Sequence, residues 1–529
     1  MIEKIISTNA FWRNNIFFLL IFIGMAAVYY DGVLNQSPLN EHQWRQTDCL
    51  SLTHNYAENA HFFSPELHNL LADQETTGKS AGEFPILYWV VGNIWKLTGE
   101  SYFVYRVFYL MILLLGVLAV FNSFLIMLKD WVWSSVLTLL LFTSPVFVFY
   151  GVSFLTDIPA MCFVFLAGYF LLLYHKKGAW RFLLFAFFFF ALAGLIKISS
   201  LIAFVVFGSL YLLERISVKT LGKEVLFKRP RFAFIGFLLV VVSIFSWYYY
   251  AYLYNQEHEF LYTFNNIYPY WLMDQEGIDL LLEQFSSHTS YLFLSRPLYL
   301  LLGLMGTINL FLIKKIPPIA YIANLLVLTG CFVYAMLWAP LLGIHDYYFG
   351  ALLIVIPGIS LPFAWYIRTN FPKIFESKYT KVLLSLFLVY NFFACANIIR
   401  IKTDKHAINL IQEAKPTFYQ EQGWFNWDNG QWKRFVEMKP YIREIGIRAQ
   451  DKVIVLSDPS FSISLYYLNQ KGWTNYLNYD QASQIDHLIN KGAKYLFIFE
   501  PDIKNKEFLK PFLKDSIGDY KNIRIFKLH

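Results

Sequence analysis

The chain has 529 residues, of which 57% are hydrophobic, 20% aromatic and only 15% charged. This composition is far more apolar than that of a soluble domain, and it predicts a membrane protein. The net charge of +7 does not predict nucleic-acid binding, because the basic residues recur in short clusters between apolar runs, as they do in cytoplasmic loops. The four cysteines share no metal-ligand spacing, so neither a zinc site nor a disulfide framework is expected.

Apolar runs of spanning length recur along the first part of the chain and predict an all-α polytopic membrane bundle of about eleven transmembrane helices. The runs lie near residues 15–30, 102–128, 131–150, 157–174, 181–197, 199–214, 232–254, 297–313, 316–339, 347–367 and 381–400. Basic residues gather in every second loop, for example at Arg13, Lys129 and Lys176. This alternation predicts a cytoplasmic N-terminus and a C-terminal tail on the opposite side.

Two long segments fall on the outer side of this topology. The first outer loop, 31–101, contains a short apolar stretch at 84–98 that suits a helix at the membrane interface better than a span. Long ordered loops are usually functional. The second outer loop, 255–296, is rich in aromatic residues such as Tyr262 and Trp271. These are typical of an interfacial belt, and stacking on sugar rings is the alternative.

The composition becomes mixed polar and apolar at about residue 401. Buried strands are predicted at 452–456 and 494–499, a third at 522–526, and helices at 461–469 and 481–491. We therefore expect residues 1–400 to form a transmembrane domain and 401–529 a small soluble α/β domain outside the membrane. The tail has no glycine-rich phosphate loop, so nucleotide binding is not expected there.

Ionisable residues at the outer helix ends are the candidates for chemistry, because a charge at membrane depth is costly unless it serves a purpose. Five basic or potentially basic side chains break the positive-inside pattern: Arg45, Arg106, Lys197, Arg296 and His345. Snorkelling to lipid headgroups explains any one of them equally well. Together they indicate an anionic, lipid-linked substrate.

The outer acids are Asp48, Glu83, Asp157 and Asp346. Asp157 stands at the start of a predicted helix, where an N-cap role explains it as well as catalysis does. Glu83 has the alternative role of a first-turn acid. Asp48 has no comparable structural role, although a solvated loop acid is the alternative, and its spacing from Arg45 predicts an acid/base group beside an anion site. Trp44 is expected to be an anchor.

Four of these segments carry a family resemblance. His42-Gln43-Trp44-Arg45-Gln46-Thr47-Asp48, Glu83-Phe84-Pro85 with Tyr88, Thr156-Asp157-Ile158-Pro159 and His345-Asp346-Tyr347-Tyr348 resemble the bacterial membrane glycosyltransferases of the C superfamily over about residues 10–400. The most similar branches are the dolichyl-phosphate-mannose protein mannosyltransferases and the aminoarabinose lipid A transferases. The resemblance implies that Asp48 is the catalytic base and that Asp157 matches the second outer acid. Many members have an Asp-Glu pair where this chain has Asp48-Cys49, which leaves the need for a second loop acid open.

The resemblance implies an inverting transfer of a hexose or pentose from a polyprenyl phosphate to an acceptor outside the bacterial cytoplasmic membrane. The acceptor would be lipid A, a protein or a surface glycan. Asp48 would take the hydroxyl proton, and the five basic residues, with Glu83 and Tyr347, would form the substrate and phosphate site. The implied partners are the donor lipid, the acceptor and the bilayer. The resemblance implies no nucleotide and assigns no cofactor; a divalent metal stays open, for which Asp48 and Asp157 would be a small ligand set.

The alternative function is a polytopic transporter or flippase of a lipid-linked or anionic substrate. Such a protein would show internal repeats, broken helices and acids near mid-span. The apolar runs here are largely free of mid-span charge, and the acids lie at their outer ends. The sequence therefore favours the transferase.

Overall fold

The computed structural model describes residues 8–38, 41–71, 77–216, 225–263, 267–286, 290–312, 315–403, 423–499 and 506–528, and over 423–431 it describes the backbone alone. The chain divides into two compact units. The helical unit comprises Met1–Asn35, Tyr105–Tyr248 and Asn266–Phe418, and the sheet unit comprises Gln36–Val104, Tyr249–Asn265 and Tyr419–His529.

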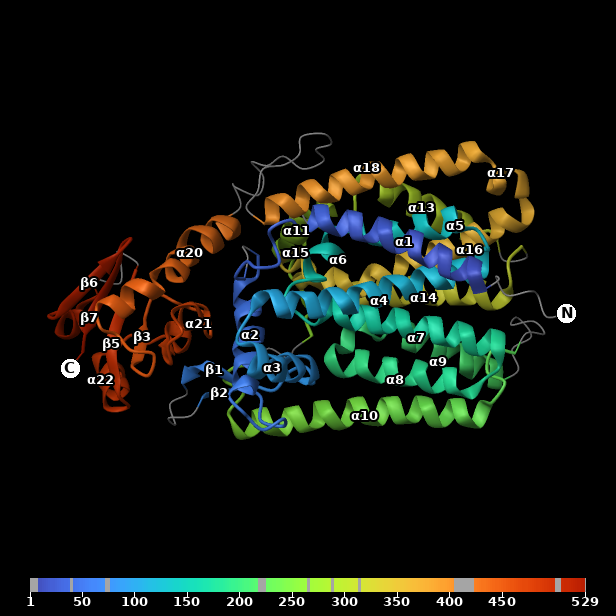
Figure 1. Ribbon diagram of the computed structural model, residues 1–529. Coiled ribbons are helices and arrows are strands. Elements are labelled where there is room, and N and C mark those ends of the chain that lie inside the picture. Colours follow the sequence, from blue (N-terminus) through green and yellow to red (C-terminus); the bar gives the residue numbers. More distant parts are fainter. Residues whose placement is uncertain are drawn as a thin grey trace. The chain divides into compact units, whose positions relative to one another are not determined.

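Long α-helices that run alongside one another form the helical unit (Figure 1). They are α1 (Thr8–Tyr29), α4 (Tyr102–Leu128), α7 (Asp157–Lys177), α8 (Trp180–Ile196), α9 (Ile202–Arg215), α10 (Pro230–Glu257), α13 (Arg296–Leu310), α14 (Pro318–Leu337), α16 (Val355–Asn370) and α18 (Lys378–Lys402). Shorter helices connect them: α5 (Trp131–Leu141), α6 (Pro145–Tyr150), η1 (Ile198–Leu201), η3 (Tyr270–Leu272), α11 (Gln275–Gln284), α12 (Ser290–Phe293), α15 (Ala339–Ile344), η5 (Asp346–Ile354) and α17 (Pro372–Glu376).

Each of the eleven predicted runs is helical, but the described part of the chain contains eight helices that are long and apolar enough to cross a membrane. The run at 131–150 is divided because Ser144 caps a new helix whose first residue is Pro145, a position that favours proline. Helices α9 and α16 reach spanning length together with the preceding 3-10 helices, as Ile198–Arg215 and Asp346–Asn370. Helices α8, with 17 residues, and α13, with 15, are shorter than the roughly 20 residues of a typical span. Residue 313, at the end of one predicted run, lies outside the described residues. The predicted orientation stays a prediction.

Asparagine side chains join helices inside the helical unit. Asn15 of α1 and Asn122 of α4 exchange hydrogen bonds of 3.1 and 3.0 Å. Asn309 of α13 and Asn324 of α14 donate to backbone carbonyls of α16, each at 2.9 Å. Such amides join transmembrane helices because an unsatisfied polar group in hydrocarbon is costly.

The sheet unit contains one seven-stranded mixed sheet with the order β2-β1-β4-β3-β5-β7-β6. Its strands are β1 (Glu66–Leu71), β2 (Thr77–Lys79), β3 (Lys452–Val455), β4 (Gly472–Thr474), β5 (Ala493–Ile498), β6 (Ser516–Tyr520) and β7 (Ile523–Lys527). Its helices are α2 (Gln43–Ala57), α3 (Ile86–Thr98), α20 (Gly423–Glu444), α21 (Ile463–Leu468), η6 (Asn475–Leu477), α22 (Ala482–Asn490) and η7 (Glu507–Phe512). The three strands and two helices predicted in the tail are therefore confirmed as β3, β5, β7, α21 and α22.

Strand β1 of the first predicted loop belongs to the same sheet as the C-terminal strands. Leu70 pairs with Gly472 in parallel register, and Asn69 donates a 3.2 Å hydrogen bond to the carbonyl of Gln470. A Cβ at Gly472 would lie 1.9 Å from the carbonyl oxygen of Val453, so this strand position requires glycine. The domain boundary predicted at residue 401 stays a prediction, and residues 404–422 lie outside the described residues. Within the sheet unit, residues 36–104 pack with the C-terminal tail.

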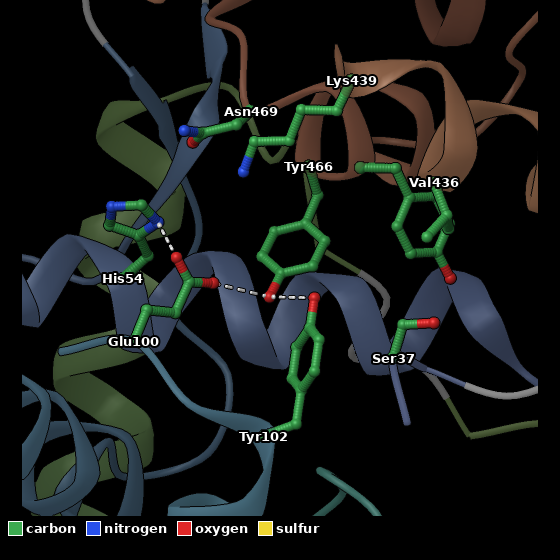
Figure 2. A pocket seen from close by; sticks show the side chains of 9 residues that line it. Ser37, His54, Glu100, Tyr102, Val436, Lys439, Tyr466 and Asn469 are labelled. Atoms are coloured by element: carbon green, nitrogen blue, oxygen red, sulfur yellow. Dashed lines mark hydrogen bonds and ion pairs between the residues drawn. The ribbon is translucent and has the colours of Figure 1, made fainter. Parts of the chain in front are cut away.

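Helix α2 packs against α3 on one side and contacts α21 on another. A Cβ at Gly92 of α3 would lie 2.8 Å from the carbonyl oxygen of Thr53, so the absence of a side chain allows the two helices to approach closely. On the α21 side, the hydroxyl of Tyr466 lies 3.0 Å from the Glu100 carboxylate (Figure 2). The helix predicted at 84–98 is confirmed as α3, and its location at a membrane interface stays a prediction.

Candidate active site

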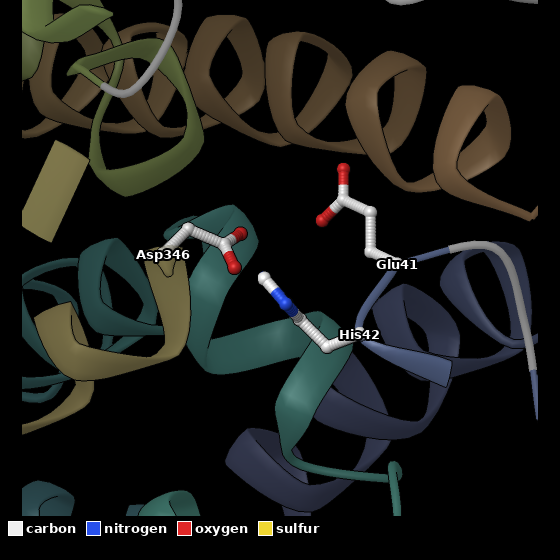
Figure 3. A group of neighbouring side chains, drawn as sticks. All are labelled: Glu41, His42 and Asp346. Atoms are coloured by element: carbon white, nitrogen blue, oxygen red, sulfur yellow. The ribbon is translucent and has the colours of Figure 1, made fainter. Parts of the chain in front are cut away.

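The segment that ends at Asp48 forms the start of helix α2, inside the predicted first outer loop. Glu41 and His42 form the turn that leads into α2 (Figure 3). His42 has a φ of 53°, a left-handed conformation that non-glycine residues adopt rarely. Gln46 donates a 2.7 Å hydrogen bond to the carbonyl of Glu41 and so closes the turn. Asp48 is therefore carried in the second turn of a helix, which positions a side chain better than a loop does.

Asp48 is a buried carboxyl group with a partner from the tail. It is 5% exposed, and Ser462 donates a 3.2 Å hydrogen bond to its Oδ1. Burial raises the pKa of Asp48 to about 7, against the charge of Arg45 and the Ser462 hydrogen bond, which both lower it. The charges of Asp458 and Glu83 add to the increase. A carboxylate that titrates near neutral pH suits a general base.

Arg45 lies one helical turn before Asp48 and forms an ion pair with Glu83. The Glu83 side chain is 11% exposed and that of Arg45 32%, so part of the Arg45 side chain is open to solvent. Glu83 lies three residues before the start of α3, and the ion pair accounts for it better than a first-turn role does. Cys49 lies 3.3 Å from the Tyr88 hydroxyl, and burial raises its pKa to about 12, so it is a neutral thiol.

Asp458 is a second buried acid near Asp48, and the sequence analysis missed it. It is 0% exposed and accepts hydrogen bonds of 2.5 to 2.8 Å from the backbone N–H and hydroxyl of Ser460 and of Ser464. Burial raises its pKa, while these bonds lower it. The available signal was the run of serines after β3, because functional groups gather beyond the carboxyl ends of parallel strands.

Aromatic side chains surround Trp44. Its ring centroid lies 5.2 Å from that of Phe461 and 6.1 Å from that of Tyr476. Tyr262 packs on the same two rings, at 5.6 and 6.0 Å. Trp44 therefore anchors against other side chains of the protein. The same ring contacts account for Tyr262, so this residue does not need a place in an interfacial belt.

The helical unit brings Asp157 and Lys197 together, 3.1 Å apart. Asp157 is the first residue of α7, and the N-cap position belongs to Thr156, so the alternative N-cap role does not apply to Asp157. Lys197 Nζ lies 5.8 and 5.6 Å from the ring centroids of Tyr347 and Tyr348.

The ring of His345 stacks on Tyr347 at 5.3 Å. Four of the predicted residues, Asp157, Lys197, His345 and Tyr347, are therefore neighbours. They combine a lysine already paired with a carboxylate, an imidazole and aromatic surface.

Arg106 and Arg296 contact other parts of the helical unit. Arg106 is 2% exposed, donates a 2.8 Å hydrogen bond to the carbonyl of Val152 and lies 4.4 Å from the Phe154 ring, which is a structural role. Arg296, the first residue of α13, is exposed and lies 4.7 Å from the ring of Tyr291.

Lys402 is an ionisable residue that the sequence analysis did not consider. It is fully buried and lies 2.6 Å from Asp346, which also accepts a hydrogen bond from Tyr150. The criterion applied to the other residues, a charge at the end of an apolar run, would have included it. The last predicted apolar run, 381–400, ends two residues before Lys402.

Comparison with known proteins gives one family match and a shared fold. Residues 82–250 match the family described as Dolichyl-phosphate-mannose-protein mannosyltransferase. No curated protein sequence matches the chain. Among solved structures, ArnT from Cupriavidus metallidurans bound to undecaprenyl phosphate has a TM-score of 0.58 at 11% identity, over 97% of this chain and 98% of that one. The apo state of the same protein has a TM-score of 0.58 at 10% identity, over 99% of both chains.

The family match over residues 82–250 supports the resemblance to the glycosyltransferase C superfamily, and the likeness to ArnT shows a shared fold. The apolar helices and this fold agree in describing a multi-pass membrane protein.

Proposed function

We propose that the protein, as a membrane glycosyltransferase of the C superfamily, transfers a sugar from a polyprenyl-phosphate donor to an acceptor outside the bacterial cytoplasmic membrane. The observation that carries this proposal is the buried Asp48, with a pKa of about 7 and with Arg45 and Ser462 beside it. The undecaprenyl phosphate in the ArnT structure supports a lipid phosphate as the donor group. The proposed active site faces the extracytoplasmic side.

The proposed reaction is a single displacement with inversion. The acceptor oxygen forms a bond to the anomeric carbon while the bond from that carbon to the phosphate oxygen breaks. The hydroxyl proton passes to the Asp48 carboxylate, which acts as general base. The polyprenyl phosphate leaves with one more negative charge than it had in the donor, so it needs cations and not an acid.

Arg45 is the proposed phosphate ligand beside Asp48 in the sheet unit, and Lys197 and His345 are the basic candidates of the helical unit. The side chains of Arg45 and Lys197 are 32% and 15% exposed, so both can meet a ligand. Glu83 and Tyr347 would orient these groups through the contacts described above, and Asp157 would do so through Lys197. Arg296 is exposed and is a weaker candidate for a phosphate ligand. The hydrogen bond from Arg106 to the carbonyl of Val152 favours a structural role for Arg106 over phosphate binding.

The test uses the purified protein in liposomes with a panel of polyprenyl-phosphate sugars and follows the loss of lipid-linked sugar. Asp48→Asn should abolish transfer while the protein still accumulates in the membrane. The matched control Asp480→Asn changes an exposed aspartate of the same unit and should retain activity. Full activity of Asp48→Asn would overturn the base assignment.

The transporter alternative makes the opposite prediction. Uptake of an anionic substrate into sealed vesicles without any polyprenyl sugar, together with no transfer from any donor in the panel, would overturn the proposed function.

A further inference from the structure

A small polar pocket lies in the sheet unit, apart from Asp48. Its volume is about 200 Å³, below the roughly 300 Å³ at which pockets for drug-sized ligands begin. Its walls include His54, Glu100, Tyr102, Lys439, Tyr466 and Asn469, which surround one space in Figure 2. Such a space holds one small ring and excludes a polyprenyl chain.

Several contacts hold the Glu100 carboxylate in place. One carboxylate oxygen lies 3.0 Å from the Tyr466 hydroxyl, which in turn lies 3.2 Å from that of Tyr102. The other oxygen lies 3.8 Å from His54, whose ring stacks on His68 at 4.2 Å. The polar groups of the pocket are therefore arranged before any ligand binds, which reduces the entropy lost on binding.

The chemistry of the walls favours a neutral ligand with many hydroxyl groups. Glu100 accepts hydrogen bonds, Lys439 donates them, and Asn469 does both. Glu100 opposes an anion and Lys439 opposes a cation, whereas a hydroxyl group both donates and accepts. The tyrosine rings add flat apolar surface of the kind on which the C–H face of a sugar packs.

We propose that this pocket binds a sugar ring of the acceptor, so that the acceptor is a saccharide. The ligand's identity as the acceptor rests on the proposed function, whereas saccharide binding does not.

The pocket and Asp48 are built on the same two elements. His54 follows Asp48 by six residues on α2, a rise of about 9 Å along the helix axis. Tyr466 belongs to α21, and Ser462, the partner of Asp48, occupies the position just before the first residue of that helix. A ring in the pocket is therefore distinct from the ring whose hydroxyl would react at Asp48.

The binding test uses the full chain in lipid nanodiscs, because glycoside detergents would compete for the pocket. The probes are methyl glycosides of neutral hexoses and of N-acetylhexosamines, and saturation-transfer NMR detects the bound probe. At least one glycoside should bind the wild type, and Val436→Trp, which fills the pocket with a large side chain, should abolish binding.

A milder variant tests the hydrogen bonding without changing the backbone. Asn469 has a φ of 51°, which glycine adopts freely, so Asn469→Gly removes only the amide. Affinity should fall about five- to tenfold, as expected for one lost hydrogen bond. Lys433→Gln, on an exposed position of α20 outside the pocket, is the matched control and should bind as the wild type does.

Three outcomes would overturn the proposal that the pocket binds a saccharide. They are that no glycoside binds, that Val436→Trp binds as well as the wild type, or that inorganic phosphate displaces the glycoside, which would indicate an anion site. Asp48→Asn should bind glycosides normally. If glycosides bind but no donor supports transfer, the proposed function fails and the saccharide pocket stands. If transfer occurs and Asn469→Gly leaves the acceptor KM unchanged, the acceptor assignment fails.

Discussion

Ser462 donates a hydrogen bond to Asp48 across 3.2 Å, although 414 residues separate the two in the chain. Both side chains are buried. A hydrogen bond to a buried carboxylate favours its charged form, so the C-terminal segment stabilises the ionised state that a general base requires. The surroundings of Asp48 therefore include residues of the C-terminal tail as well as residues of the first predicted outer loop.

Removal of that hydrogen bond should shift the pH dependence of transfer upward. In Ser462→Ala the pKa of Asp48 loses a lowering influence, so we expect the inflection of the rate profile to move from near pH 7 to a value higher by roughly half to one unit. The pH profile of sugar transfer measures it. Ser462→Thr keeps the hydroxyl and should retain the wild-type profile, and an unchanged inflection in Ser462→Ala would contradict the assignment.

Replacement of Asp458 should move the same inflection in the opposite direction. The negative charge of Asp458 raises the pKa of Asp48, so Asp458→Asn should lower the inflection. The new amide also meets N–H and hydroxyl donors of Ser460 and Ser464, which should cost about 1–3 kcal/mol of stability. The direction in which the inflection of the pH profile moves, measured on the folded protein, is therefore the informative result. An upward move would show that the charge of Asp458 does not raise the pKa of Asp48.

The pKa of Asp48 also predicts how stability depends on pH. The pKa is about 7 in the folded protein and about 3.9 in an unfolded chain, so between these values the folded state binds more protons than the unfolded state. The free energy of unfolding should fall as the pH rises from about 4 to 7, with no further change above 7 from this residue. Thermal unfolding of the wild type and Asp48→Asn from pH 5 to 8 measures it. Parallel curves for the two proteins would contradict the prediction.

The buried pair of Lys402 and Asp346 should matter for stability. Lys402→Met leaves the Asp346 carboxylate buried without its cation, which typically costs about 3–5 kcal/mol. The double variant Lys402→Met, Asp346→Asn removes both charges and should recover much of this loss. Thermal unfolding in nanodiscs measures both, and equal stability of the single and double variants would show that the charges are not coupled.

The cluster around Lys197 should affect donor binding more than Arg296 does. Lys197→Gln removes a cation that lies among Asp157, Tyr347 and Tyr348, and we expect the KM for the donor to rise about tenfold or more. Arg296→Gln removes an exposed cation that lies on Tyr291, and its effect should be less than about threefold. Donor titrations at fixed acceptor concentration compare the two, and the reverse order would assign the phosphate to Arg296.

Helices and strands that can be recognised from their own residues were predictable from the sequence. Hydrophobic runs identified every membrane helix region, and short apolar stretches identified β3, β5 and β7, because the burial of a segment is visible in its own residues. The length of a continuous helix was less predictable, since one polar cap before Pro145 divides a run that hydropathy alone makes continuous.

Which distant residues meet depends on the tertiary structure. Asp48 could be singled out as an acid next to Arg45, but its pKa also depends on two residues of the tail, Ser462, which lowers it, and Asp458, which raises it. In the same way, β1 joins a sheet whose other central strands lie some 400 residues later, and Lys402 reaches Asp346 from another helix. Such pairings leave no periodic trace in the sequence, because they depend on how the elements pack and not on the composition of any one of them.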